Sequence, residues 1–234
     1  MNDSYRDPSI ITKGLKRQGQ KCAGCYVRGS EAELKICSRC KATNLYLQEH
    51  KAVCLRNAEH AAQVAEVDAS GISSILLPPG VTFVELDNRL EKWIKFHNST
   101  LMAATIHALS LPLDLTRSKT HVLQMSVRPR TDHNGVAAKF FRIIDASVIE
   151  ISAAQQYPPP WPESIEQLAA LREESEGKQR GTVAAVGIEC PPLGVQFVPF
   201  GSLRNLSALR ILPDWKEIVI RDVERAKKFT KFGG

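Results

Sequence analysis

Six potential zinc ligands are crowded near the N-terminus of this 234-residue chain. They form two Cys-x-x-Cys pairs and one His-x-x-x-Cys pair: Cys22, Cys25, Cys37, Cys40, His50 and Cys54. A Cys-x-x-Cys turn brings two thiolates within reach of one ion, and a His and a Cys four residues apart share one face of a helix. Each pair is therefore half of a tetrahedral site, and the spacing predicts a zinc-binding segment.

The segment from Cys37 to Cys54, CSRCKATNLYLQEHKAVC, resembles the MYND-type zinc finger. The pattern of that family is C-x2-C, C-x2-C, C-x3-C and H-x3-C, in which the first and third pairs bind one zinc ion and the second and fourth pairs another. The third pair is missing here, because only nine residues separate Cys40 from His50. The segment thus reads as a MYND-type finger with an internal deletion.

The resemblance implies one complete zinc site with four ligands: Cys37, Cys40, His50 and Cys54. It leaves Cys22 and Cys25 without partners, so a second zinc ion would need ligands that the sequence does not reveal. A rival arrangement uses the two Cys-x-x-Cys pairs alone, as in a ribbon-like four-cysteine site, and makes His50 and Cys54 ordinary helix residues. We expect one zinc ion, and two only if further residues complete the first site.

The function implied by the resemblance is protein interaction. MYND fingers bind short proline-rich peptides of partner proteins through a shallow groove beside the second zinc ion. Part of the wall of that groove belongs to the segment that is missing here. We therefore expect a zinc-binding protein whose finger acts as an interaction module, with a proline-rich peptide as its partner.

The clustered thiols also bear on where the protein works. Residues 1–8 carry Asp3, Arg6 and Asp7, and no apolar run follows them, which is unlike a secretory signal. In a reducing compartment, clustered cysteines hold metal rather than forming disulfides. We expect an intracellular protein of the nucleus or cytoplasm. No stretch approaches the roughly 20 apolar residues that span a bilayer, so we expect no membrane partner.

The net charge of +6 is concentrated at the N-terminus. Residues 1–56 hold 11 Lys or Arg against 5 Asp or Glu, a balance of +6, which leaves 20 of each sign in residues 57–234. A basic segment can attract nucleic-acid phosphates, so association with nucleic acid is one alternative function. The charges are scattered, however, without the helix-borne base-reading positions of a DNA-binding finger.

Composition changes divide the chain into four parts. Residues 1–21 form a basic arm, residues 22–56 the truncated finger, residues 57–80 a helical connector that ends in Leu77-Pro-Pro-Gly80, and residues 81–234 the largest domain. With 43% hydrophobic residues overall, the chain has room for one substantial core beside the finger.

The largest domain reads as α+β, with packed helices and antiparallel β-hairpins. The expected elements are one or two packed helices over 86–109, strands over 120–130 and 139–151, a helix between Pro162 and Gly177, strands over 182–190 and 194–200, and a helix from Asp214. The order of helix, hairpin, helix, hairpin and helix predicts an antiparallel sheet.

Two helices in this domain have predicted buried faces. In the helix before Gly177 the apolar residues are Ile165, Leu168, Ala169 and Leu171. In the last helix they are Trp215, Ile218, Val219, Val223 and Ala226. This region also resembles the C-terminal parts of uncharacterised fungal proteins that carry MYND fingers, through phrases such as Val198-Pro-Phe-Gly-Ser-Leu203. That resemblance implies a family and no reaction.

The domain carries no recognised catalytic motif, so we do not expect an enzyme. Four of its histidines are dispersed over different elements: His97, His107, His121 and His133. The first two lie among apolar helical positions, which predicts packing rather than ligation. An enzyme remains an alternative if His121 and Asp145 meet near Arg142 as an acid-base pair. Cys190 stands alone in an apolar run and is predicted to be a small buried hydrophobic residue.

Overall fold

The computed structural model describes residues 62–77 and 80–227 of the chain, which divides into two compact units, Met1–Ile72 and Ser73–Gly234. In the first unit the described residues form a helix over 62–69, within the connector. The six predicted zinc ligands lie outside the described residues. None of the helices in the described part of the chain is both long and apolar enough to cross a membrane.

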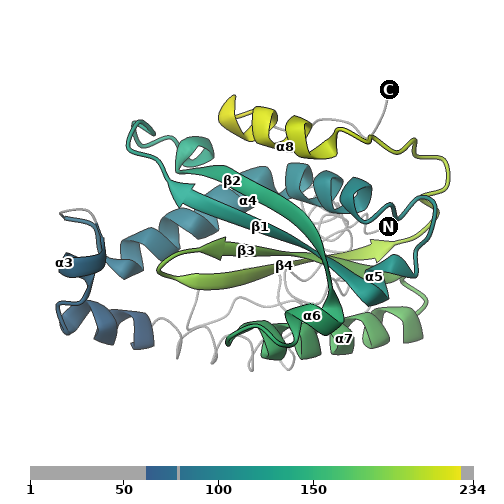
Figure 1. The fold of residues 1–234 in the computed structure, drawn as a ribbon, viewed down its shortest axis with the longest axis horizontal. Helices are drawn as coiled ribbons and strands as arrows, with labels where there is room; N and C mark the ends of the chain where they lie inside the picture. Colours follow the sequence, from purple (N-terminus) through teal and green to yellow (C-terminus); the bar gives the residue numbers. More distant parts are fainter. Residues whose placement is uncertain (1–61, 78–79, 228–234) are drawn as a thin grey trace, which may run out of the picture. The chain divides into compact units, whose positions relative to one another are not determined.

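The second unit is a four-stranded mixed sheet with helices on both faces (Figure 1). Its α+β class agrees with the sequence. The strands are β1 (His121–Pro129), β2 (Phe141–Glu150), β3 (Thr182–Cys190) and β4 (Gly194–Leu203), in the spatial order β2-β1-β3-β4. The helices are α3 (Ser73–Leu76), α4 (Phe83–Ala108), α5 (Arg117–Thr120), α6 (Ile151–Ala154), α7 (Trp161–Gly177) and α8 (Trp215–Glu224), with a 3-10 turn η1 (Ala137–Lys139) before β2.

Both predicted hairpins form, but the prediction of an antiparallel sheet is wrong at its centre. β1 pairs with β2 and β3 pairs with β4 in antiparallel fashion, whereas β1 and β3 run parallel. The chain reaches β3 from the end of β2 through α6 and α7, a crossover long enough to return it to a parallel partner. Periodicity in the sequence predicts each hairpin separately, but not which strand of the first hairpin pairs with which strand of the second.

Helix α4 begins at a clear sequence signal and covers one face of the sheet. The side chain of Thr82 accepts a hydrogen bond from the backbone N–H of Glu85, as an N-cap residue does (3.1 Å). The buried stripe of the helix then recurs every three or four residues through Leu86, Leu90 and Trp93. Trp93 packs edge to face on Phe141 of β2, with ring centroids 6.0 Å apart.

Helix α7 covers the opposite face, with Trp161, Ile165 and Leu168 in its core cluster. The next position in that stripe is Arg172, which is 8% exposed, while Leu171 is 45% exposed. The predictions that Ala169 and Leu171 are buried are therefore wrong, since both are exposed. The Arg172 guanidinium donates hydrogen bonds to the backbone carbonyls of Val183 and Ser118, so a polar group occupies the buried position with its donors satisfied.

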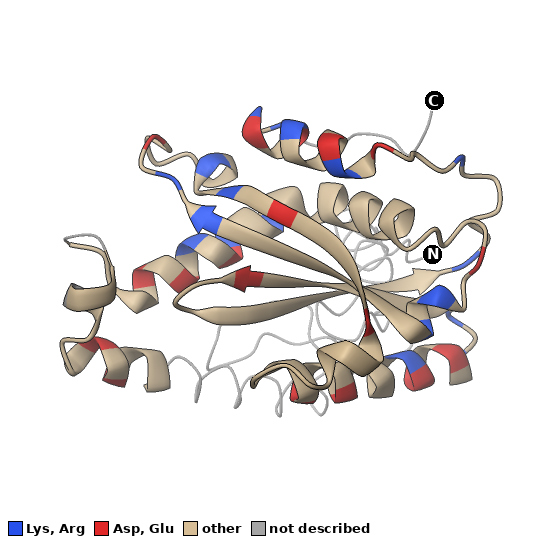
Figure 2. Ribbon diagram, in the orientation of Figure 1, with Lys and Arg blue, Asp and Glu red and all other residues tan. Residues whose placement is uncertain are grey.

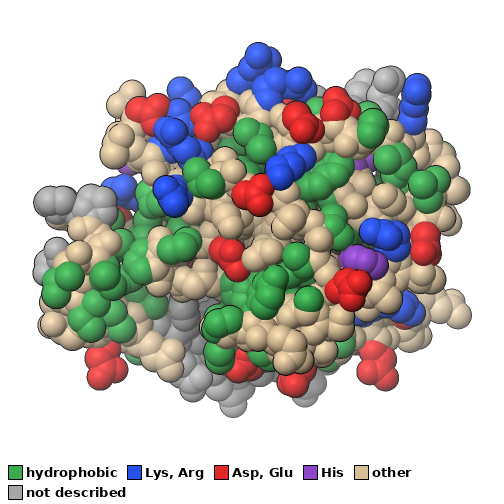
Figure 3. Space-filling view, viewed as in Figure 1, with side chains coloured by type: hydrophobic (Ala, Val, Ile, Leu, Met, Phe, Trp, Pro, Cys, Tyr) green, Lys and Arg blue, Asp and Glu red, His purple; other side chains and the backbone are tan. Residues whose placement is uncertain are grey.

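Helix α8 lies beside α4 and is joined to the first hairpin by ion pairs. Val219 and Val223 are buried, whereas the predicted core residues Trp215, Ile218 and Ala226 are only half-buried. The charged residues of the unit lie mostly on the outer faces of the helices and in the hairpin (Figure 2). On the face shown in Figure 3, acidic and basic side chains are interspersed over the described residues.

Candidate functional site

The structure leaves the zinc prediction untested, because all six proposed ligands precede the described residues. Among residues 62–77 and 80–227, no three His, Cys, Asp or Glu side chains gather as they would around a metal ion. Cys190 is fully buried in β3, as predicted, and burial raises the pKa of its thiol to about 12. A thiol held neutral in this way is a packing group rather than a nucleophile or ligand.

The proposed acid-base pair of His121 and Asp145 does not form. His121 opens β1 opposite Glu150, and Asp145 lies opposite Ser126, five residues further along the strand. At about 3.4 Å per residue the two positions are roughly 17 Å apart. Asp145 instead accepts a hydrogen bond from the ammonium of Lys216 at 2.6 Å, which lowers the pKa of its carboxyl.

His97 and His107 pack in the interior, as the sequence predicts. His97 is fully buried and bonds through Nε2 to the carbonyl oxygen of Ala138 in η1, at 2.9 Å. Since a carbonyl only accepts, the ring proton is on Nε2. Burial lowers the pKa of both histidines, because the charged imidazolium would lose its hydration. These rings therefore help to hold the fold in their neutral form.

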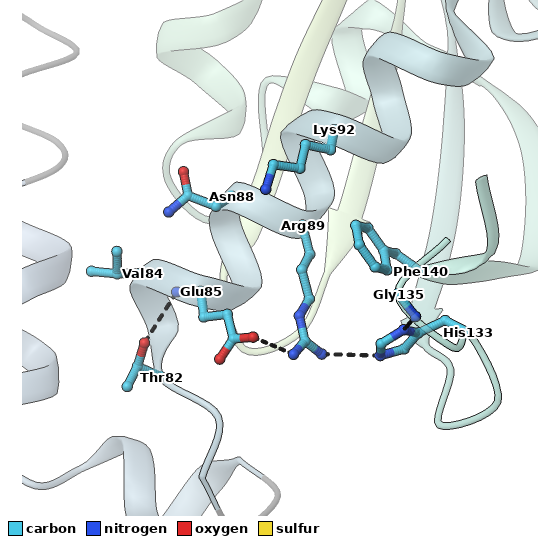
Figure 4. A pocket seen from close by; sticks show the side chains of 9 residues that line it. All are labelled: Thr82, Val84, Glu85, Asn88, Arg89, Lys92, His133, Gly135 and Phe140. Carbon is cyan, nitrogen blue, oxygen red and sulfur yellow. Dashed lines mark hydrogen bonds and ion pairs between the residues drawn. The ribbon is translucent and has the colours of Figure 1, made fainter. Parts of the chain in front are cut away.

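A surface recess of about 560 Å³ lies between the first half of α4 and the loop that joins β1 to β2 (Figure 4). Both sides belong to the second unit. The described residues that line the recess come from one face of the helix and from the loop: Thr82, Val84, Glu85, Asn88, Arg89, Lys92, His133, Gly135 and Phe140. Its volume is within the range of about 300–1,000 Å³ found for small-molecule sites.

Arg89 stands at the centre of this recess. Its Nη2 forms an ion pair with Glu85, one helical turn earlier, and its Nη1 lies 3.3 Å from Nε2 of His133 (Figure 4). The guanidinium also lies over the ring of Phe140, 5.8 Å from the centroid. Packing on an aromatic ring holds the flat guanidinium in place and keeps its edge directed toward the recess.

The ring of His133 is oriented by its own loop. The backbone N–H of Gly135 donates to Nδ1 at 2.9 Å, and the ring meets Phe140 edge to face at 5.0 Å. A neutral imidazole whose Nδ1 accepts carries its proton on Nε2. The Nε2–H group then points at Nη1 of Arg89, which is also a donor.

Another polar cluster lies on the α7 face of the sheet, around the only charged residue of β3. The carboxylate of Glu189 accepts hydrogen bonds from Gln124 Nε2 (2.9 Å), Trp161 Nε1 (3.2 Å) and Ser126 Oγ (3.2 Å). Three neutral donors stabilise the charge without a cation. The cluster joins β1, β3 and α7, so we interpret it as a hydrogen-bond network that stabilises their packing.

The recess on α4 was not predicted from the sequence. Arg89 and Lys92 were visible as charged residues on the polar side of a predicted helix, and His133 as part of a predicted loop. Nothing in the local pattern indicates that this loop folds back against the first half of the helix. No protein-family model, curated protein or solved structure matches the chain.

Proposed function

We propose that this chain is a zinc-binding protein whose N-terminal finger acts as an interaction module attached to an α+β domain. The observation that carries the proposal is the spacing of six thiol and imidazole ligands within 33 residues, from Cys22 to Cys54. Random cysteines do not fall in two Cys-x-x-Cys pairs followed by His-x-x-x-Cys.

Our preferred ligand set is the one that the MYND resemblance implies: Cys37, Cys40, His50 and Cys54. A single zinc ion bound there would close the finger, since a structural zinc site contributes roughly 10 kcal/mol or more to the folding of a small domain. The α+β domain has its own core on both faces of its sheet, which supports a finger that folds as a separate unit. Clustered reduced thiols are consistent with the nucleus or cytoplasm as its location.

The partner that we propose is a proline-rich segment of another protein. Such segments adopt a polyproline II conformation before binding, so they lose little entropy on a shallow surface. The basic residues of 1–56 are scattered along the sequence, without the helix-borne base-reading positions of a DNA-binding finger, which favours this partner over nucleic acid.

Zinc stoichiometry of the purified full chain tests the metal site. We expect one zinc ion per chain by elemental analysis, retained in Cys22→Ser and lost in Cys37→Ser. Cys190→Ser is the matched control, because this thiol is buried in β3 and should not alter the zinc content. Equal loss in the first two variants would support the four-cysteine arrangement instead, and a wild-type chain without zinc would refute the finger.

Peptide binding is tested separately from zinc. A library of proline-rich peptides should contain sequences that bind the wild-type chain and fail to bind Cys37→Ser, while Cys190→Ser binds them normally. If peptides bind both variants equally, the finger is not the docking site. If none binds a chain that holds its zinc, the interaction part of the proposal is wrong and the metal site stands.

A further inference from the structure

The recess on α4 brings together hydrogen-bonding groups from the helix and from the β1–β2 loop. Nε2–H of His133 and Nη1 of Arg89 face each other at 3.3 Å, and the bond from Gly135 to Nδ1 prevents the ring from turning its acceptor toward the arginine. An oxygen atom placed beside both groups would accept from each, and a charged oxygen would do so most strongly.

The charges around the recess favour an anion with more than one negative charge. Arg89 and Lys92 contribute two positive charges, and Glu85 contributes one negative charge that is already paired with Arg89. Lys92 and Asn88 make no side-chain hydrogen bond or ion pair with any described residue. A ligand with a single carboxylate would only exchange the ion pair between Glu85 and Arg89 for an equivalent one. A phosphate group brings three terminal oxygens and a charge of about −1.5 to −2 at neutral pH.

The recess has space for more than a phosphate group. Its volume of about 560 Å³ matches a small organic ligand, and its lining includes two apolar side chains, Val84 at one end and Phe140 at the other (Figure 4). Asn88 adds an amide that can both donate and accept. This combination of apolar side chains and a few convergent polar groups is typical of sites for small molecules.

We propose that the α4 recess binds the phosphate group of a small phosphorylated molecule, through Arg89, Lys92 and Nε2–H of His133. Glu85 positions Arg89 in the free protein and competes with the ligand for it. The site lies entirely in the second unit, so the proposal is independent of the zinc finger.

The experiment is a binding titration of the full-length chain at constant ionic strength. The probes are inorganic phosphate, phenyl phosphate and acetate, and binding is followed by calorimetry. We expect phosphate to bind and acetate not to. We expect phenyl phosphate to bind more tightly than inorganic phosphate, because its ring can contact one of the two apolar side chains of the lining, Val84 or Phe140.

Variants of exposed residues locate the site without disturbing the core. Lys92→Gln should weaken phosphate binding by about tenfold, since a hydrogen bond to a charged group contributes roughly 1.5 kcal/mol or more. Glu85→Gln should strengthen it, because the competing carboxylate is gone. Lys95→Gln is the matched control: it removes the same charge from an exposed position on the same helix that does not line the recess.

Four results would overturn the proposal. Equal effects of Lys92→Gln and Lys95→Gln would show general charge attraction, and binding that disappears in Cys37→Ser would place the anion on the finger. Acetate binding as tightly as phosphate would exclude phosphate recognition. If phenyl phosphate does not bind more tightly than inorganic phosphate, the ligand is a free phosphate ion and the proposed small molecule is wrong.

Discussion

Helix α7 packs closely on the sheet at Gly187 of β3. A Cβ atom at this position would lie 2.6 Å from Cη2 and 3.1 Å from Cζ3 of Trp161, and 3.2 Å from Cε2 of Phe197. Side-chain atoms do not approach this closely, so Gly187→Ala must push the indole, and with it α7, away from the strand. The backbone of Gly187 does not need a positive φ, so the effect is one of space alone.

The size of the effect follows from the rigidity of the neighbours. Trp161 is 4% exposed and is held by its hydrogen bond to Glu189 and by edge-to-face contact with Phe197 at 4.9 Å. Inserting a methyl group into such a site costs about 1–3 kcal/mol. For a domain of this size, that lowers the melting temperature by roughly 2–4 °C for each kcal/mol.

Gly201→Ala is the matched control in the neighbouring strand. A Cβ atom there meets nothing closer than Val183 Cγ2 at 4.0 Å, and its φ is also ordinary. The same chemical change should be neutral or slightly stabilising, by up to about 1 kcal/mol, through the reduced entropy of the unfolded chain. Urea unfolding of both variants measures the difference.

A double-mutant cycle identifies the atoms that collide. Trp161→Phe removes the outer part of the indole, so it should cost less in the Gly187→Ala background than in the wild type, with a coupling energy of about 0.5–3 kcal/mol. If the two changes are additive, or if Gly187→Ala is as harmless as Gly201→Ala, α7 does not pack on β3 through this tryptophan.

Two further predictions concern buried titratable groups. Burial lowers the folded-state pKa of His97 and His107 below 6.5, so the unfolded chain binds protons before the folded chain does. The free energy of unfolding should therefore fall as the pH drops below about 6.5. The decrease should be at most about 1.4 kcal/mol per pH unit for each ring. Urea unfolding between pH 7.5 and 5.5, with zinc chelated, measures how the free energy of unfolding changes with pH. His107→Gln should make this pH dependence less steep, and an unchanged pH dependence would contradict a lowered pKa for His107. With zinc removed, a thiol reagent should label five cysteines of the folded chain, and Cys190 only after unfolding; rapid labelling of all six would contradict its burial.

The sequence predicted the helices and strands well because their signals are local. Apolar residues at helical spacing from Leu86 onward predict α4, although its N-cap at Thr82 was not predicted, and alternation along β1 and β2 sets the faces of the hairpin. Two features depend on tertiary contacts and were missed. The parallel pairing of β1 with β3 depends on how α7 crosses the sheet, and the burial of Arg172 depends on carbonyl groups of Val183 and Ser118 from distant parts of the chain.

Of the two candidate sites, only the zinc ligands could be predicted from local sequence. A finger of the Cys-x-x-Cys kind is visible in sequence, because its ligands are close along the chain. The recess on α4 is not visible, since Arg89 and His133 are 44 residues apart and meet only when the β1–β2 loop folds onto the helix. Charged residues on a predicted helix normally indicate a solvated surface, so the number of charged residues on α4 could not have revealed the recess.

The loop that forms one wall of the recess is held in place by contacts that do not involve a ligand. Near the end of the loop, His97 forms a hydrogen bond with the backbone of Ala138. At the start of the loop, Arg130 donates to Asp132 and to Glu224 of α8, and the closest contact to each is 2.7 Å. This pairing also holds the pKa of Asp132 well below its usual range. A ligand therefore does not have to order the loop, and less binding free energy is lost on association. Changes at Lys92 should alter phosphate affinity without altering the stability of the domain, because none of these anchoring contacts passes through that side chain.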